Sequence, residues 1–238
     1  EELQRFAHQK GLVFFSSPFD HEAVDFLDKM GVSAYKVASF EITDIPLIEH
    51  IATKQKPIII STGVATLEDI NEAIKACYKH KNHHIILLKC TSSYPAALGD
   101  MNLSMITDLK ERFSLAVGLS DHSLSPLPPS IAVALGACVI EKHLTLKRSS
   151  GGLDSKFSLE PDEFSEMVKR IRQTEEALGE KEYALTKQGQ NNRFFARSLY
   201  VIKDLQKGET FTSHHIGSIR PNKGLSPKYL NDIIGKKA

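Results

Sequence analysis

The sequence lacks the features that mark several common classes of protein. It has only three cysteines in 238 residues, Cys77, Cys90 and Cys138, and none forms a C-x-x-C pair. Redox motifs and zinc ribbons need such pairs, so we interpret these residues as buried thiols in a reducing compartment. No apolar run approaches the roughly 20 residues that span a bilayer, and no secretory signal is visible. We therefore expect a cytoplasmic protein with no membrane partner.

Neither sign of charge dominates the chain, and two nucleotide-binding motifs are missing. Lys and Arg number 30 and Asp and Glu 29, a formal net charge of +1. This balance gives no reason to expect a nucleic acid as partner. No G-x-G-x-x-G follows the first apolar run, and no Walker sequence appears. An open doubly wound sheet is therefore unsupported.

What the sequence does contain is a regular alternation of short apolar runs and amphipathic segments. The predicted strands are Leu12–Phe15, Ala34–Ala38, Pro57–Ile60, His84–Lys89, Leu115–Leu119 and Cys138–Ile140. Helical periodicity or caps occur in Asp20–Met30, Thr66–Lys79, Pro126–Ala137 and Pro161–Leu178. Continuous apolar strands alternating with helices predict a parallel sheet covered by helices. The length of each strand–helix unit fits a TIM-type (β/α)8 barrel, whose first two strands would precede Glu1.

The pattern changes after about residue 185. We predict a partial barrel domain over residues 1–184, a polar linker over 185–192 and a small β-rich domain over 193–238. Two strand-like runs lie in the last segment, Arg197–Ile202 and Ile216–Arg220.

Two histidines close successive predicted strands. His122 follows the run that ends at Asp121, and His143 follows the run that ends at Lys142. Neighbouring parallel strands can bring both imidazoles to one metal ion, and imidazole suits Mn, Fe, Co or Zn. With two protein ligands, positions would stay open for water and substrate, as in a Lewis-acid site. The alternative is that each histidine is a hydrogen-bonded structural residue.

Residues with hydroxyl side chains lie at the carboxyl ends of five predicted strands. In a barrel, these strand ends meet at one opening. The hydroxyl residues include Ser17, Ser39, Ser61, Ser92 and Ser120. With Lys36 pointing inward, this ring suits a phosphate or carboxylate, although serines at strand ends also bond local backbone. A desolvated Lys36 could instead form a Schiff base with a carbonyl substrate. The loop Gly151–Lys156 could close over a ligand, with Asp154 bonding sugar hydroxyls, or be a solvated turn.

The chain resembles the sialic acid synthase family, whose members condense phosphoenolpyruvate with an amino sugar. The motifs are Lys36–Glu41 (KVASFE), Ser61–Gly63 (STG), Cys90–Pro95 (CTSSYP), Gly118–His122 (GLSDH) and Glu141–His143 (EKH). They occur in the family's order along the whole chain. Residues 89–92, 100–103 and 154–159 are most similar to the branch of the family that makes pseudaminic acid. The segment from Arg197 to Pro221 resembles the start of the family's antifreeze-like (SAF) domain.

The resemblance implies roles for individual residues. His122 and His143 match ligands of a divalent metal, usually Mn²⁺, with Mg²⁺ or Co²⁺ as alternatives. Positions around phosphoenolpyruvate are matched by Ser17, Lys36, Ser39, Ser61 and Ser120. Positions around the acetamido sugar are matched by Glu41, Ser92, Tyr94 and Asp154. Lys36, Glu41 and the two histidines would be catalytic. Phe195 and Arg220 match residues that a partner subunit lays over the active site, which implies a domain-swapped homodimer.

The resemblance also sets expectations about completeness and leaves other functions open. The family's first two strands, an acidic residue expected in proton transfer and much of the SAF domain lie outside this sequence. We expect this chain alone to be weak or inactive and the full-length protein to be active. The substrate could instead be N-acetylmannosamine or the legionaminic acid precursor. A Schiff-base aldolase and a non-catalytic sugar-phosphate binding module are further alternatives.

Overall fold

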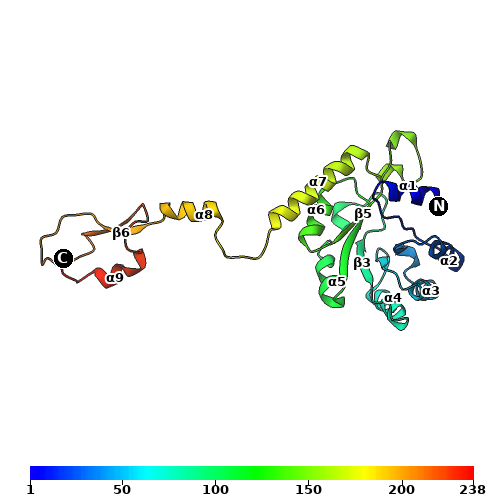
Figure 1. Cartoon of the computed structure of the whole chain (residues 1–238), viewed down its shortest axis with the longest axis horizontal. Helices are drawn as coiled ribbons and strands as arrows, with labels where there is room; N and C mark the ends of the chain where they lie inside the picture. Colours follow the sequence, from blue (N-terminus) through cyan, green and yellow to red (C-terminus); the bar gives the residue numbers. More distant parts are fainter. The chain divides into compact units, whose positions relative to one another are not determined.

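The computed structural model describes all residues, Glu1–Ala238 (Figure 1). The chain divides into two compact units, Glu1–Gly179 and Glu180–Ala238.

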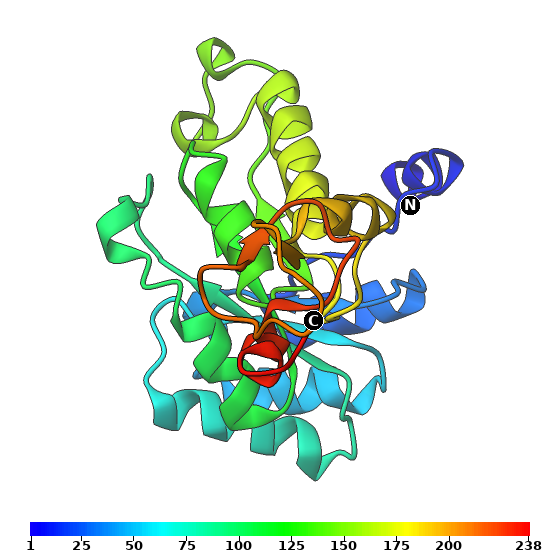
Figure 2. The ribbon, with the colours of Figure 1, turned by 90° about the vertical axis from the view of Figure 1, so that its left-hand side faces the viewer.

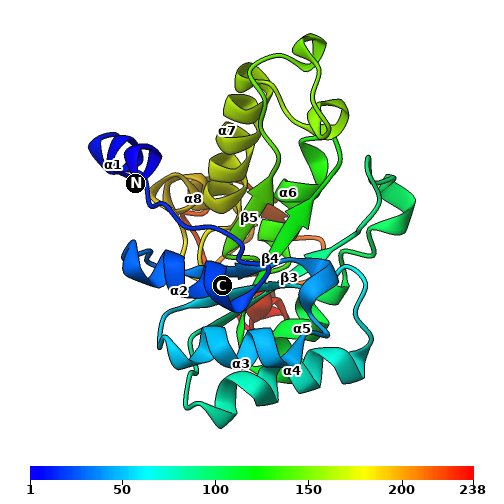
Figure 3. The ribbon, with the colours of Figure 1, turned by 90° about the vertical axis from the view of Figure 1, so that its right-hand side faces the viewer.

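The first unit is built on a curved sheet of five parallel strands in sequential order (Figure 3). The strands are β1 (Tyr35–Val37), β2 (Ile58–Ser61), β3 (Ile85–Cys90), β4 (Ala116–Asp121) and β5 (Val139–Lys142). Each pairs with the next strand in parallel register. A helix lies between successive strands, which confirms the predicted α/β fold of TIM-barrel type.

Helices cover the outer face of this sheet. They are α2 (His21–Lys29), α3 (Ile45–Thr53), α4 (Leu67–Lys79), α5 (Met105–Phe113), α6 (Leu127–Ala134) and α7 (Pro161–Leu178), preceded by α1 (Glu2–Gln9). Local sequence explains where they begin. Thr66 and Asp69 form a capping box at α4, and the side chains of Asp20 and Asp44 accept hydrogen bonds from the first turns of α2 and α3.

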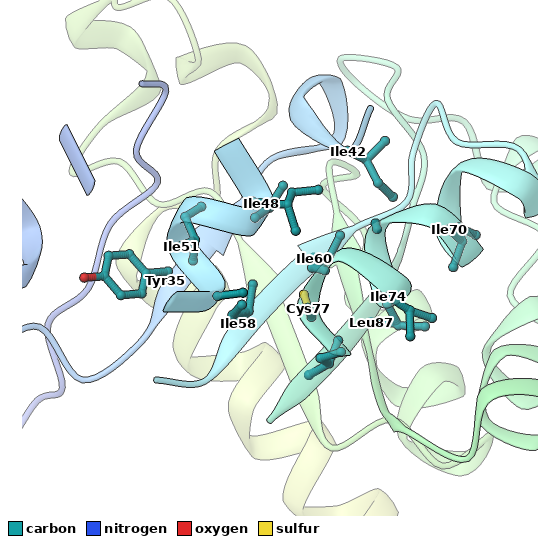
Figure 4. Close-up of a cluster of buried hydrophobic side chains, with 14 of the residues drawn as sticks. Tyr35, Ile42, Ile48, Ile51, Ile58, Ile60, Ile70, Ile74, Cys77 and Leu87 are labelled. Atoms are coloured by element: carbon teal, nitrogen blue, oxygen red, sulfur yellow. The ribbon is translucent and has the colours of Figure 1, made fainter. Parts of the chain in front are cut away.

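The core lies between the sheet and these helices. Ile58 and Ile60 of β2 and Ile48 and Ile51 of α3 are fully buried in one cluster (Figure 4). Burial of each such side chain contributes about 1.5–3 kcal/mol relative to exposure. Cys77 lies in the same cluster, and burial raises the pKa of its thiol to about 12, so it is an unreactive core residue.

Alternation along the strands sorts side chains between this core and the opposite face. On β1, Tyr35 belongs to the core cluster, whereas Lys36 lines the cavity on the concave face. On β2, Ile60 faces the core and Ser61 faces the cavity. Because successive side chains point to opposite faces, polar residues at alternate positions gather inside the curve of the sheet.

Two predictions were wrong. Leu12–Phe15 is not a strand: this part of the chain has one isolated bridge, Ser16 to Tyr35, and Leu12 is 62% exposed. Ser16 lies beyond the end of the predicted run, so none of the residues Leu12–Phe15 pairs with β1. Cys138 is exposed rather than buried, because it precedes the edge strand β5.

The second unit is small and contains two antiparallel strands, β6 (Ser198–Val201) and β7 (Ile216–Ile219), seen as short arrows in Figure 2. It also contains α8 (Lys187–Asn192) and α9 (Leu230–Ile233). Residues 187–192, which the sequence analysis assigns to the linker, are therefore helical.

None of the helices combines the length and the apolar character that crossing a membrane requires.

Candidate active site

A cavity of about 370 Å³ opens at the carboxyl ends of the five strands. It contains most of the predicted site residues. Its lining consists of Ser17, Lys36, Ala38, Ser39, Ser61, Cys90, Tyr94, Ser120, His122, Glu141, Lys142 and His143. The predicted convergence of strand-end residues on one mouth is therefore observed for these positions.

Lys36 supplies the positive charge of the cavity. Its Nζ donates hydrogen bonds to Ser61 Oγ at 2.8 Å and to the Val37 carbonyl at 2.9 Å, and it lies 3.7 Å from a carboxylate oxygen of Glu141. Burial lowers the pKa of Lys36, and the nearby carboxylates of Glu141 and Glu41 oppose this shift. The Lys36 ammonium can pair with an anion, and the neighbouring hydroxyl groups can donate hydrogen bonds to the same anion.

Glu141 is a site residue that the sequence analysis does not assign. It accepts a hydrogen bond from Ser120 Oγ at 2.6 Å, and the two residues are register partners on β4 and β5. Alternation along β5 could have indicated it, because Glu141 is two residues before His143 and therefore on the same face.

The two predicted metal-binding histidines lie side by side, with ring centroids 5.2 Å apart. Nδ1 of His122 is 3.0 Å from the Thr91 carbonyl. That bond needs the proton on Nδ1, which leaves Nε2 as the lone-pair nitrogen, an arrangement typical of metal-binding histidines. Tyr94 and Phe157 pack on the rings at centroid distances of 4.4 Å (Tyr94 to His122) and 4.9 Å (Phe157 to His143).

The surroundings affect the protonation of the two rings differently. Burial lowers the pKa of His143, and neighbouring His122 lowers it further. Burial opposes the charge on His122 as well, but hydrogen bonds to Cys90 and to the Thr91 carbonyl outweigh it and raise its pKa. Of the two rings, His143 is therefore the one that its surroundings favour in the neutral form.

The separation of the histidines fits a shared metal ion. The ring centroids are 5.2 Å apart and the ring planes are inclined by 56°, so the two imidazoles are close enough that they would be able to hold one divalent ion between them. No third His, Cys, Asp or Glu completes a metal-binding cluster with them, so further coordination positions would be open to water and substrate.

Cys90 and Ser39 line another part of the cavity, and Gly63 and Ser92 lie beside them. Ser39 Oγ lies 3.4 Å from Cys90 Sγ and accepts a hydrogen bond from the Gly63 amide at 3.1 Å. Ser92 Oγ is 3.9 Å from the same sulfur. Burial opposes ionisation of Cys90, but hydrogen bonds with His122 and Ser39 outweigh it and lower the pKa of the thiol. Cys90 was predicted as a buried structural thiol; it is buried, but it also lines the cavity.

The remaining predicted residues lie around the cavity or in the second unit. Glu41 ends the short 3-10 helix Ser39–Glu41, and its Oε2 is buried without a hydrogen-bond partner. Asp154 Oδ2 lies 3.6 Å from His143 Nδ1. Phe195 and Arg220 belong to the second unit, and their place over an active site stays a prediction.

This geometry places the chain among (β/α)-barrel enzymes, which build their active sites at the carboxyl ends of the strands. The chain belongs to the NeuB family: residues 1–183 match the NeuB family model and residues 196–238 match the SAF domain model.

Named relatives agree with this assignment. A pseudaminic acid synthase of Campylobacter jejuni is 49% identical over 98% of the chain and 68% of its own length. An N,N'-diacetyllegionaminic acid synthase of the same species is 41% identical over 100% of the chain and 72% of its own length. The crystal structure of an N-acetylneuraminic acid synthetase from Leptospira borgpetersenii superposes with a TM-score of 0.76 at 36% identity, covering 80% of this chain and 67% of that one.

Proposed function

We propose that the protein is a pseudaminic acid synthase, which condenses phosphoenolpyruvate with 2,4-diacetamido-2,4,6-trideoxy-L-altrose and water to give pseudaminate and phosphate. The observation that carries the proposal is that one cavity holds a cationic, hydroxyl-lined end beside a pair of metal-competent histidines. The chain is 49% identical to a pseudaminic acid synthase and 41% identical to a legionaminic acid synthase. This difference supports the pseudaminic acid precursor over the legionaminic acid precursor as the sugar substrate.

Phosphoenolpyruvate would bind at the lysine end of the cavity. The Lys36 ammonium and the hydroxyls of Ser39, Ser61 and Ser120 are the donors that a phosphate and a carboxylate require. Ser17 also lines the cavity and would contact the same substrate. Ser61 already shares its hydroxyl with Lys36, so one anion could contact both.

His122 and His143 would hold a divalent ion, with Mn²⁺ as the first choice and Mg²⁺ or Co²⁺ as alternatives. When bound, such an ion supplies Lewis acidity that polarises the sugar aldehyde. The Thr91 carbonyl keeps His122 in the tautomer that binds metal.

The acetamido sugar would lie against the polar groups near the histidines. Glu41 Oε2 is buried without a partner, so a sugar hydroxyl or amide there would supply the hydrogen bond that it lacks. Asp154, near His143, and Ser92, near Cys90, would add polar contacts to the sugar. The half-exposed ring of Tyr94 would give it an apolar surface beside His122.

The proposed reaction forms one carbon–carbon bond and breaks one bond to phosphate. Carbon 3 of phosphoenolpyruvate attacks the aldehyde carbon, and the aldehyde oxygen takes up a proton to become a hydroxyl. Water adds to the cationic carbon 2 and gives up a proton, and the resulting tetrahedral intermediate expels inorganic phosphate to leave a ketone. The cavity residues orient both substrates and stabilise charge, whereas the electrons come from the enol phosphate itself.

The second unit would complete the site from a partner subunit. We propose a domain-swapped homodimer in which Phe195 and Arg220 of one chain cover the active site of the other. Analytical ultracentrifugation of the full-length protein tests this, with a dimer as the expected result.

The test of function is phosphate release by the full-length protein with phosphoenolpyruvate, Mn²⁺ and each candidate sugar in turn. Release with the 2,4-diacetamido altrose sugar supports the proposal. Release only with N-acetylmannosamine or with the legionaminic acid precursor contradicts the pseudaminic assignment and moves the protein to another branch.

Burial of Lys36 also suits a Schiff-base aldolase. Borohydride trapping of substrate on Lys36, together with activity that survives chelation, would favour that alternative. Binding of phosphoenolpyruvate with no phosphate release under any of these conditions would indicate a non-catalytic binding module.

A further inference from the structure

A fully buried ion pair joins the two strands that carry the histidines. The Lys142 ammonium donates hydrogen bonds to Asp121 Oδ2 and to the Ser123 carbonyl, and the side chains of Lys142 and Asp121 are both 0% exposed. Asp121 Oδ1 in turn accepts a hydrogen bond from the Ser123 amide at 2.8 Å.

The charged groups of the pair are buried and do not face the cavity. Successive side chains on a strand point to opposite faces, so Asp121 and Lys142 point away from the face on which His122 and His143 lie. The carboxylate that does face the cavity is Glu141, which bonds Ser120 instead. Lys142 is one of the residues that line the cavity, but its ammonium is fully buried against Asp121, so neither charged group is placed to contact a substrate.

The position of the pair suggests another use. Asp121 and Lys142 form the last register pair of β4 and β5, and each directly precedes a histidine. Beyond this point the segments that follow β4 and β5 no longer pair with each other. The His122 carbonyl accepts a hydrogen bond from the Ala96 amide, and the His143 carbonyl accepts one from the Leu159 amide. The ion pair is the side-chain contact that ties the strands together at the residues immediately before the two rings.

We propose that the Lys142–Asp121 pair is a positioning device that fixes the separation of His122 and His143 so that both can bind one divalent ion. The inference rests on the metal site of the proposed function. Two desolvated charges gain little net stability from pairing, and apolar residues of similar volume often replace such a pair without loss. The directional hydrogen bonds of the pair, in contrast, hold two backbones at a set distance, and metal affinity depends on such outer contacts.

The experiment measures Mn²⁺ affinity and urea stability side by side in the full-length protein. The main variant is the double substitution Lys142→Met/Asp121→Leu, which removes both charges and keeps side-chain volume. We expect a stability close to that of wild type and a Kd for Mn²⁺ about 10- to 100-fold higher, the loss that outer-shell changes produce. Leu119→Ala is the matched control: it removes a buried side chain from the same face of β4, so it should lower stability and leave the Kd within about twofold of wild type.

Two further variants keep every outcome informative. His143→Ala should abolish Mn²⁺ binding, and if it does not, the metal site of the proposed function fails, whatever the ion-pair variants show. Lys142→Arg keeps the charge but presents a planar fork in place of a point donor, so we expect an Mn²⁺ Kd at least about threefold higher in a folded protein. Lys142→Arg serves as the test if Lys142→Met/Asp121→Leu does not fold. A wild-type Kd for Mn²⁺ in a folded form of either variant overturns the positioning role. An equal loss of Mn²⁺ affinity in Leu119→Ala overturns it as well.

Discussion

Ser120 and Glu141 are register partners on adjacent strands, and the Ser120 hydroxyl donates a 2.6 Å hydrogen bond to the Glu141 carboxylate. The other carboxylate oxygen lies 3.7 Å from Lys36 Nζ. Glu141 thus links the lysine end of the cavity to the strand that carries His122. In the proposed function, Glu141 would therefore orient the donors that face phosphoenolpyruvate.

Glu141→Gln should reduce kcat/KM for phosphoenolpyruvate by about 100-fold, because it removes the carboxylate that opposes the lowering of the Lys36 pKa by burial and it weakens the acceptor that orients Ser120. Steady-state phosphate release measures the effect. Ser120→Ala and the double variant complete a cycle: since the two side chains bond each other, the double variant should lose less than the sum of the single losses. Strict additivity would show that the pair does not act as a unit.

Gly63→Ala should impair activity through crowding. A Cβ at Gly63 would lie 2.1 Å from Ser92 Oγ, 2.8 Å from Ser39 Oγ and 2.9 Å from Cys90 Sγ, so these side chains would have to move. Overpacking of this kind costs about 1–3 kcal/mol, and we expect a folded protein with a raised KM for phosphoenolpyruvate. The control is Gly99→Ala, where a Cβ meets no atom within 4 Å; similar kinetics in the two variants would contradict the prediction.

Removal of the metal should abolish phosphate release, and added Mn²⁺ should restore it. In His122→Ala and His143→Ala, Mn²⁺ should not restore activity, and the loss should exceed the about 10- to 100-fold typical of outer-shell changes. Circular dichroism of each variant checks the fold. Full activity of the wild type in excess chelator would rule out the metal in this chemistry.

The ion pair between Arg148 and Glu163 should make stability depend on pH in the acid range. Hydrogen bonds from Arg148 and from the Glu160 amide lower the pKa of Glu163 to about 2, against 4.5 in the unfolded chain. A lowered folded-state pKa stabilises the protein above pH 4.5, and this contribution is lost as pH falls towards 2. Because both side chains are partly exposed, the gain at pH 7 should be about 1 kcal/mol at most.

The measurement for this pair is urea unfolding of wild type and Glu163→Gln between pH 7 and pH 2.5. The difference in unfolding free energy between the two proteins should shrink as the pH falls below 4.5. A difference that stays constant with pH would mean that the charge of Glu163 contributes nothing. Glu166→Gln, on an exposed face of the same helix, is the control for removal of a surface carboxylate.

Local signals in the sequence were sufficient for the elements that depend on neighbouring residues. The capping residue Thr66 and the periodicity up to Lys79 predicted α4 with its observed end. The prediction of a strand at Leu12–Phe15 was wrong, because an apolar run becomes a strand only when it exchanges hydrogen bonds with a neighbouring strand. Here Ser16 alone forms a bridge, to Tyr35. Glu141 and Cys90 were missed as site residues because their roles come from partners 21 and 51 residues away in the chain, Ser120 and Ser39.

The sequence by itself determined the alternation of strands and helices, the family, and the polar residues that close the strands, because these depend on local periodicity and on motifs within short segments. Only the tertiary structure decided which of those residues meet. The register of β4 against β5 pairs Ser120 with Glu141 and Asp121 with Lys142, and it leaves the rings of His122 and His143 with centroids 5.2 Å apart. Register is completed by hydrogen bonds and packing between strands that are distant in sequence, whereas the local pattern constrains only which face of the sheet each side chain takes.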